Sequence, residues 1–213
     1  MKLKLMPRIS IILLLVGVLI QRNERMKYWI SFLIIIIPLL GIGQVSKNLE
    51  LISTVDIDEI GNDVWGFRHS NGIEYAIMGD NNSTRIISLE DPMAPVEVAD
   101  IEGAVSTWRD FKHFNDVVYV VADRGTDGIL VIDMADVSNN VLTHTFLNPE
   151  VTVDSVASTV NRCHNLFVND DGYLYLSGCN VGVGGVIIFD LNADPLQPEF
   201  AGIENLRLSL IHI

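Results

Sequence analysis

The sequence predicts an all-β fold, namely an incomplete β-propeller of about three four-stranded blades. Three segments share one pattern: a strand that begins near a tyrosine, a turn rich in Gly, Asp and Asn, and an apolar strand. The tyrosines are Tyr75, Tyr119 and Tyr175, spaced by 44 and then 56 residues. Short strands that recur at about this period are typical of propeller blades. No amphipathic helix is evident after residue 44, which supports the all-β class.

Each repeat contains four predicted strands. A short strand precedes each tyrosine, in "DVWGF", "DFKHF" and "HNLFV", and the tyrosine strand and the apolar strand follow it. A fourth strand, "VEVADI" in the first repeat and "EFAGI" in the third, comes after a shared "DPxxP" turn. The second repeat has "ADVSNN" at the place of that turn. Val, Ile, Tyr and Phe favour strands, and Gly, Asn, Asp and Pro punctuate them.

Two apolar runs precede the repeats, and neither reaches the roughly 20 residues of a membrane-spanning helix. The second run has the layout of a secretory signal, with Lys27 as its positive start and Gly41 and Gly43 at the −3 and −1 places of a cleavage site. We therefore expect residues 26–43 to be a signal peptide and residues 1–25 to lie upstream of the native start. The alternative is that the two runs form a helical hairpin anchor.

We expect the two ends of the chain to differ in origin from the repeats. "LSLIHI", residues 208–213, has neither turn nor strand context and looks like a translated sequencing adapter. We expect native sequence to stop near Arg207, so that residues 44–207 hold the blades of a longer protein. The alternative is a genuine apolar terminus.

The charge of the repeats excludes one class of partner. Residues 44–213 contain eight Lys and Arg against 26 Asp and Glu, a net charge of −18. Binding to nucleic acid needs a basic surface for the phosphates, so no nucleic-acid partner is expected. Acidity of this degree favours solubility and at most attracts cations.

Two of the repeats carry a family resemblance. "TRIISLEDPMAPVEV" and "GILVIDM" resemble LVIVD repeats, which occur in secreted, propeller-like bacterial proteins. The run from "NDVWGF" to "CHNLFVNDDGYLYLSGC" resembles the choice-of-anchor B family, and the resemblance covers about residues 48–203. It implies display at the cell surface or secretion, with anchoring signals that differ between lineages. It implies no defined reaction.

Both cysteines lie in one predicted hairpin. A turn at residues 169–172 would pair Val168 with Tyr173 and bring Cys163 within one position of Cys179. An exported chain meets an oxidising compartment, where two such cysteines form a disulfide. The alternative is a metal group of Cys163 with the adjacent His164, although zinc needs three or four ligands at close spacing.

Polar residues near the starts of the first strands form the candidate ligand-binding group. Alignment of the three first strands places Asp63, Asp110 and His164 at one position. The innermost strands of propeller blades surround a channel, so these side chains would converge at its mouth, with Arg109 and Lys112 as counter-charges. Two interpretations stay open: a site for a cation or small polar ligand, and rim residues bonded to the neighbouring blade.

The expected function is therefore a secreted or cell-surface binding module for an extracellular ligand or protein that the sequence does not identify. The alternative is a hydrolase-like propeller enzyme with a metal or acid–base group at the channel mouth. No catalytic motif of the common hydrolase types is present, so a binding module is preferred to an enzyme. No cofactor is indicated, and a divalent cation has no ligand spacing to support it. Membrane contact is expected only through the N-terminal segment or a C-terminal anchor.

Overall fold

The computed structural model describes residues 49–57, 59–139 and 141–204. These ranges contain 14 β-strands, one short 3₁₀-helix and no α-helix, which confirms the all-β prediction. The strands belong to the second of two units into which the chain divides, Leu51–Ile213. No helix in the described ranges is long and apolar enough to span a membrane. The expected signal peptide, the upstream residues 1–25 and the terminal residues 208–213 lie outside the described residues.

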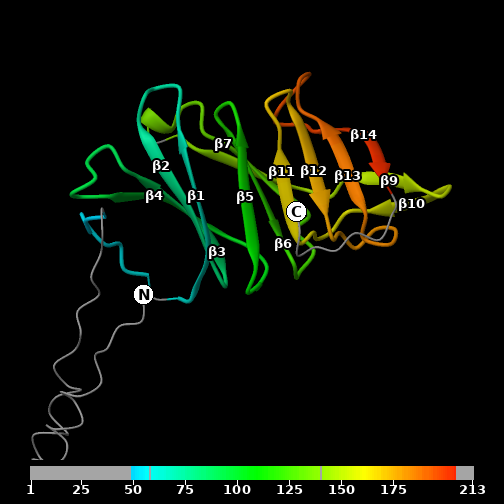
Figure 1. Ribbon diagram of the computed structural model, residues 1–213, viewed down its shortest axis with the longest axis horizontal. Helices are drawn as coiled ribbons and strands as arrows, with labels where there is room; N and C mark the ends of the chain where they lie inside the picture. The colour runs from blue at the N-terminus through cyan, green and yellow to red at the C-terminus, as the bar shows by residue number, and fades with distance from the viewer. Residues whose placement is uncertain (1–48, 58, 140, 205–213) are drawn as a thin grey trace, which may run out of the picture. The chain divides into compact units, whose positions relative to one another are not determined.

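Twelve of the strands form three four-stranded antiparallel sheets, and each sheet corresponds to one sequence repeat. Within each sheet the strands follow one another in chain order (Figure 1). The first sheet contains β1 (Gly61–Arg68), β2 (Glu74–Asp80), β3 (Ser83–Ser88) and β4 (Val96–Glu102). The second contains β5 (Arg109–Phe114), β6 (Val117–Ala122), β7 (Ile129–Asp133) and β8 (Thr143–Leu147), with the 3₁₀-helix η2 (Val137–Asn139) before β8. The third contains β11 (Asn165–Val168), β12 (Tyr173–Ser177), β13 (Val186–Asp190) and β14 (Glu199–Glu204).

The repeat tyrosines occupy the same place in all three sheets. Each lies in the second strand and pairs with a residue of the first strand: Tyr75 with Phe67, Tyr119 with Lys112, and Tyr175 with Phe167. Side chains alternate between the two faces of a strand, so the tyrosine marks the same face of every sheet.

The sheets pack face to face through two apolar clusters. Tyr75 and Ile77 of the first sheet meet Phe111 and Ile132 of the second in one cluster. Tyr119 of the second sheet meets the third in the other cluster, together with Val117, Val121, Val131, Leu174, Leu176, Ile187 and Phe189. The tyrosine face of each of these two sheets is thus covered by the sheet that follows it in the chain. Burial of this apolar surface is the main force that holds the sheets together.

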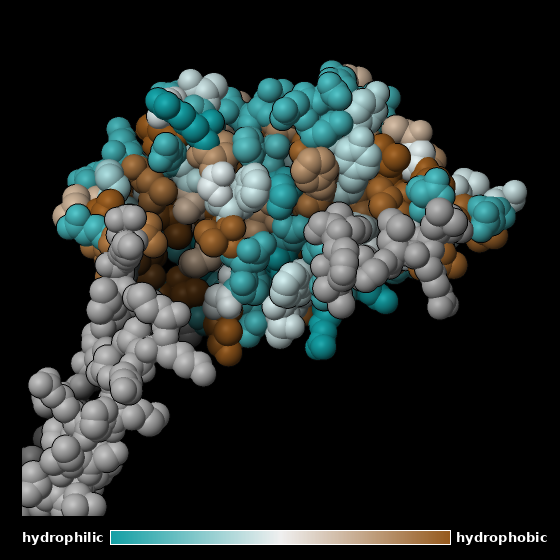
Figure 2. All heavy atoms as spheres, viewed as in Figure 1, coloured by the Kyte–Doolittle hydropathy of each residue, from teal (hydrophilic) through white to brown (hydrophobic). Residues whose placement is uncertain are grey.

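This packing brings the first strands of the three sheets side by side. β5 contacts both β1 and β11, and Figure 1 shows the three strands in the order β1, β5, β11. Figure 2 shows that hydrophilic side chains predominate along the upper rim in the same view. The first strands are therefore the place where residues from all three repeats can contribute to one site.

A two-stranded hairpin that the sequence reading did not anticipate separates the second and third sheets. It consists of β9 (Glu150–Val153) and β10 (Val156–Thr159), with Asp154 and Ser155 at positive φ in the tight turn. Val151 and Val153 are buried in the cluster between these sheets. This insertion explains why the second tyrosine spacing exceeds the first.

Candidate functional site

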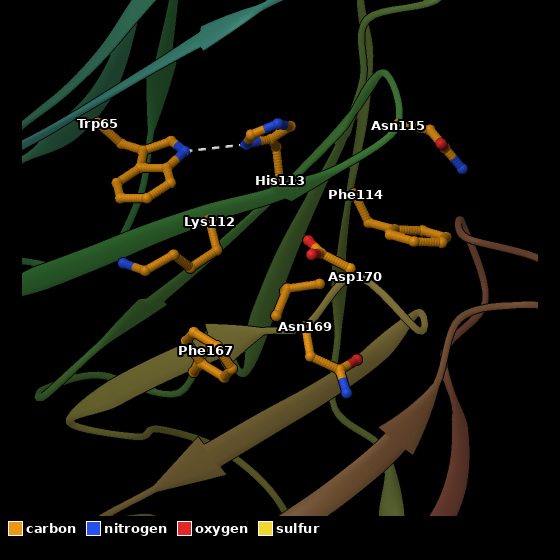
Figure 3. Close-up of a pocket in the computed structure, with 9 residues that line it drawn as sticks. Trp65, Lys112, His113, Phe114, Asn115, Phe167, Asn169 and Asp170 are labelled. Carbon is orange, nitrogen blue, oxygen red and sulfur yellow. Dashed lines mark hydrogen bonds between the residues drawn. The ribbon is translucent and has the colours of Figure 1, made fainter.

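A hollow of about 590 Å³ lies along the first strands (Figure 3). Its lining comes from all three sheets and from two turns: Trp65 of β1, Lys112, His113 and Phe114 of β5, Asn115 of the β5–β6 turn, Phe167 and Val168 of β11, and Asn169 and Asp170 of the β11–β12 turn. We call this space the central hollow. Its volume lies within the range of small-ligand pockets.

Lys112 lies in the central hollow with its ammonium group already engaged. Its Nζ donates to Asp110 Oδ1 at 3.0 Å and to the Phe111 carbonyl oxygen at 2.8 Å. The same atom lies 4.3 Å from the centroid of the Trp65 ring, a cation–π contact. Because an ammonium has three donors, these contacts account for its main interactions. Lys112 therefore connects β5 to β1.

Asp110 connects β5 to the third sheet. Its Oδ2 accepts a hydrogen bond from the Leu166 amide of β11 at 2.8 Å, and its Oδ1 accepts one from the Phe111 amide at 2.9 Å. The Asp110 carboxylate thus accepts hydrogen bonds from backbone amides of both β5 and β11, which belong to different sheets. It also pairs with Lys112. Of the two interpretations left open by the sequence, these contacts match that of a rim residue bonded to its neighbour.

His113 forms the wall of the central hollow next to Trp65. The Trp65 indole N–H donates to His113 Nδ1 at 3.0 Å. An indole nitrogen is a donor only, so Nδ1 carries no proton and the neutral ring holds its proton on Nε2. Burial lowers the pKa of His113 below its ordinary value, and the nearby charge of Asp116 only partly opposes this effect.

The pKa of His113 predicts how stability depends on pH. Because the pKa of His113 is lower in the folded state, the unfolded chain binds this proton more readily below about pH 6.5, the ordinary pKa of histidine. The contribution of His113 to the free energy of unfolding should therefore be constant above about pH 6.5 and fall as the pH drops from there towards the folded-state pKa of His113. Replacement His113→Gln keeps an acceptor for Trp65 and removes the titration. Urea unfolding of both proteins between pH 5 and 8 measures the difference, and an equal decline in both would contradict this assignment.

Arg109 is buried between the first and second sheets, with 3 % of its surface exposed. Its Nε donates to the Asp80 carbonyl oxygen at 3.1 Å, and its Nη2 donates to the Ala104 carbonyl oxygen at 2.6 Å. Burial lowers the pKa of the guanidinium, while Asp127 and Asp80 oppose that effect, and a guanidinium stays charged in proteins. Arg109 thus contacts protein groups between two sheets and does not line the central hollow.

Asp63 makes local contacts within β1. Its Oδ1 accepts a hydrogen bond from the Val64 amide at 2.8 Å, and its own amide donates to Asn62 Oδ1 at 2.7 Å. A register shift in the β1–β2 pairing falls between Gly61 and Val64. Asp63 is not among the residues that line the central hollow.

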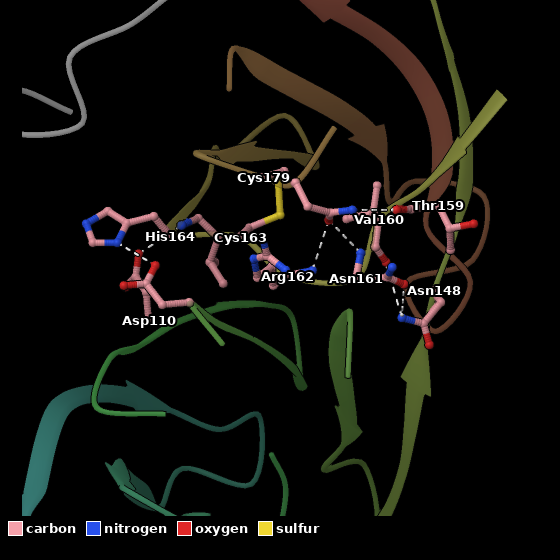
Figure 4. Close-up of a disulfide and its surroundings, with 12 residues drawn as sticks. Asp110, Asn148, Thr159, Val160, Asn161, Arg162, Cys163, His164 and Cys179 are labelled. Atoms are coloured by element: carbon pink, nitrogen blue, oxygen red, sulfur yellow. Dashed lines mark hydrogen bonds and ion pairs between the residues drawn. A yellow bond between two sulfur atoms is a disulfide. The ribbon is translucent and has the colours of Figure 1, made fainter. Parts of the chain in front are cut away.

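His164 lies immediately before β11 and pairs with an acidic residue of the second repeat. Its Nδ1 is 2.7 Å from Asp123 Oδ1. The imidazole stacks on Trp108, with ring centroids 5.2 Å apart and planes inclined by 12°. Figure 4 shows His164 beside Asp110 at the disulfide end of β11.

The sequence alignment of the first strands is wrong in detail. Strand pairing places Asp110 opposite the second residue after its tyrosine, and the residues in that place in the other sheets are Trp65 and Asn165. Asp63 and His164 are therefore not equivalent to Asp110. The error arose because a shift of one or two residues preserves the polar–apolar look of these short strands. Asp110 and Lys112 do lie together, and His164 lies near their end of the neighbouring strand.

The predicted disulfide between Cys163 and Cys179 is confirmed, and both residues are buried. The expected hairpin register is wrong by one residue, because Val168 pairs with Leu174 and not with Tyr173. The turn is longer because the Asn169 side chain accepts a hydrogen bond from the Tyr173 amide at 2.8 Å. The sulfurs are thus bonded to each other, and the alternative of a Cys/His metal group is overturned.

Hydrogen bonds around the disulfide join the second and third sheets (Figure 4). The Cys163 amide donates to the carbonyl oxygen of Ala122, at the end of β6, at 3.2 Å. Asn180 Oδ1 accepts from the Asn161 amide at 2.8 Å and from the Arg162 amide at 3.2 Å. The disulfide therefore fixes the segment that leads from the β9–β10 hairpin into β11.

The structure adds site residues that the sequence reading missed. Phe167 and Asp170 belong to the quoted hairpin, but nothing in their types distinguishes them from ordinary strand and turn residues. Trp65 packs against Lys112 and His113 while lining the central hollow. Asp123 follows β6 directly, and its partner His164 is distant in sequence.

Neither a metal-binding group of side chains nor a similar known protein indicates a role for these residues. No group of three or more His, Cys, Asp or Glu side chains within the described ranges is placed to hold a metal ion. No protein-family model matches the sequence, and no curated protein matches it.

Proposed function

We propose that this chain is part of an exported β-propeller that binds a ligand in the central hollow. The observation that carries this proposal is the convergence of β1, β5 and β11, one first strand from each repeat, on one concave space. Concave sites at the meeting point of repeated elements are common ligand sites. Phe167, which lines the hollow, has 51 % of its surface exposed, so a large apolar ring is left uncovered there.

The propeller arrangement is supported by the open face of the third sheet. Tyr119 and its pairing partner Val131 are fully buried by the third sheet, whereas the equivalent pair of Tyr175 and Ile188 is only half-buried. A further sheet of the same kind would cover Tyr175 as the third sheet covers Tyr119. This reasoning, together with the resemblance to LVIVD repeats, is the basis for proposing a propeller of the choice-of-anchor B family.

Export is the part of this proposal with the simplest test. We expect that bacteria that express the full chain release a product whose first residue is Gln44, because residues 26–43 have the layout of a signal peptide. The disulfide is compatible with an oxidising compartment. Mass spectrometry of the N-terminus decides the matter, and a secreted product that still begins at Met1 or Met26 would rule out the predicted cleavage.

Binding is tested with ligand-dependent thermal unfolding of the purified full chain. Four classes of small probe are compared: neutral sugars, acidic sugars, polyamines and short peptides. A stabilising class should lose its effect in Phe167→Ala, because this ring is the exposed apolar surface of the central hollow. If no class stabilises the chain in a manner that depends on Phe167, the binding proposal is wrong.

A second candidate function, a hydrolase-like enzyme, is favoured by one observation. His164 Nδ1 is within hydrogen-bond distance of Asp123 Oδ1, an arrangement that orients an imidazole for acid–base catalysis. Chromogenic ester and glycoside substrates test it directly. Turnover that disappears in both His164→Ala and Asp123→Asn would support an enzyme, and turnover that survives in either would exclude this pair as the catalytic group.

A further inference from the structure

The polar groups that remain free in the central hollow indicate the class of its ligand. Lys112 is engaged by Asp110, Phe111 and Trp65. Asn169 Oδ1 accepts from the Tyr173 amide, and its Nδ2 lies 3.5 Å from the Tyr175 hydroxyl. In contrast, the side chains of Asn115 and Asp170 have no hydrogen-bond or ion-pair partner among the described residues.

These two free groups lie at the tips of neighbouring turns, on the rim of the same hollow. Asn115 is in the β5–β6 turn, where its φ of 51° is the left-handed conformation of a tight turn. Asp170 is in the β11–β12 turn. Figure 3 shows the side chain of Asp170 between Phe114 and the stem of Lys112, and that of Asn115 on the other side of Phe114. The rim thus offers one amide, which donates and accepts, and one carboxylate, which accepts two hydrogen bonds.

The charges around the hollow disfavour anionic ligands, and Lys112 leaves a cationic ligand no free face of Trp65. The unpaired carboxylate of Asp170 repels anions, and the depressed pKa of His113 leaves that ring uncharged at neutral pH. A cationic ligand would seek the face of Trp65, but the ammonium of Lys112 already lies over this ring. A neutral ligand with several hydroxyl groups avoids both penalties.

An exposed aromatic ring beside planar hydrogen-bonding groups suits a sugar. A pyranose presents a weakly polar C–H face that packs on an aromatic ring, and its hydroxyl groups both donate to a carboxylate and pair with an amide. Phe167 supplies the ring, and Asp170 and Asn115 supply the polar groups. The hollow of about 590 Å³ has room for one or two such sugar units.

We propose that the central hollow binds a neutral saccharide, with its apolar face on Phe167 and its hydroxyl groups on Asp170 and Asn115. This inference rests on the proposed binding function and specifies its ligand class. It requires no metal ion and no movement of the sheets.

The test is a titration of the purified full chain with glucose, galactose, mannose, N-acetylglucosamine and cellobiose, followed by tryptophan fluorescence and thermal unfolding. At least one sugar should give a saturable change, since Trp65 lines the hollow. Replacement Phe167→Ala should weaken binding by roughly tenfold, the size of a lost aromatic contact, and Phe167→Tyr should preserve it. Asp170→Asn should weaken binding less, because one acceptor oxygen remains.

The matched control is Phe146→Ala. Phe146 is also a partly exposed phenylalanine, but it lies in β8, three strands away from β5 in the second sheet, and does not line the central hollow. This variant should bind as the unmodified chain does. Equal weakening by Phe146→Ala and Phe167→Ala would place the sugar elsewhere and overturn the proposal.

The other probe classes separate this inference from the binding function itself. If glucuronate, a polyamine or a peptide stabilises the chain through Phe167 and no neutral sugar does, the saccharide assignment is wrong and the binding function stands. If nothing binds through Phe167, both are wrong. Saturable binding of a neutral sugar that requires Phe167 supports both.

Discussion

Replacement of Arg109 by alanine is expected to lower the free energy of unfolding by about 3–5 kcal/mol, the usual cost of breaking a buried charged network. The guanidinium is almost fully buried and donates to the carbonyl oxygens of Asp80 and Ala104. Without it, these two carbonyl oxygens lose a donor and the negative charge of Asp127 loses its nearby cation. Urea unfolding of the purified full chain measures the change.

Two variants make the Arg109 result specific. Arg109→Lys keeps the positive charge but cannot donate in two directions with a planar group, so it should recover only part of the loss. Arg124→Ala removes an exposed arginine from the β6–β7 loop and should change stability by less than about 0.5 kcal/mol. If Arg109→Ala were as stable as Arg124→Ala, the role of Arg109 as a connection between sheets would be refuted.

Loss of the disulfide is expected to cost about 3 kcal/mol, because the bond closes a loop between cysteines 16 residues apart. For a chain of this size, this corresponds to a melting temperature lower by roughly 6–12 °C. The double variant Cys163→Ala/Cys179→Ala tests this by calorimetry. The destabilisation should be greatest around β11, because the bond fixes the segment between Asn161 and that strand.

Reduction of the unmodified chain separates the cross-link from the packing of the sulfurs. Both cysteines are buried, so the alanine variant loses contacts as well as the bond, whereas a reductant removes only the bond. Reduced chain should therefore melt between the oxidised chain and the double variant. A reduced chain that melts like the oxidised one would show that the bond contributes nothing to stability.

The strand pattern could be predicted from the sequence because the three repeats share the same order of strands and turns. Tyr75, Tyr119 and Tyr175 take the same place in their sheets, and short apolar strands between Gly and Asp turns leave little choice of element. The β9–β10 hairpin was missed although "EVTVDSVAST" alternates like a strand pair and the longer tyrosine spacing marked an insertion.

The side-chain site was harder to predict than the strands. Arg109 and Lys112 are close in sequence and both lie in β5, yet one is buried against the first sheet and the other lines the central hollow. Alternation of apolar and polar residues shows which face of a strand meets solvent. Both faces of the second sheet are covered by neighbouring sheets, so its sequence does not show on which face each side chain lies. Nor does sequence indicate that Asp110 reaches the backbone of Leu166 in another repeat.

The consecutive strand order within each sheet also determines how the chain can fold. Every four-stranded sheet is built from hairpins of neighbouring strands, so most pairing closes short loops and needs no long-range search. As in other arrays of repeats, one unit can form before the next is available. The tyrosine face of the first sheet is covered by the second and that of the second by the third. Ribosomal synthesis therefore delivers each covering sheet just after the sheet it must bury, and folding can advance in the direction of translation.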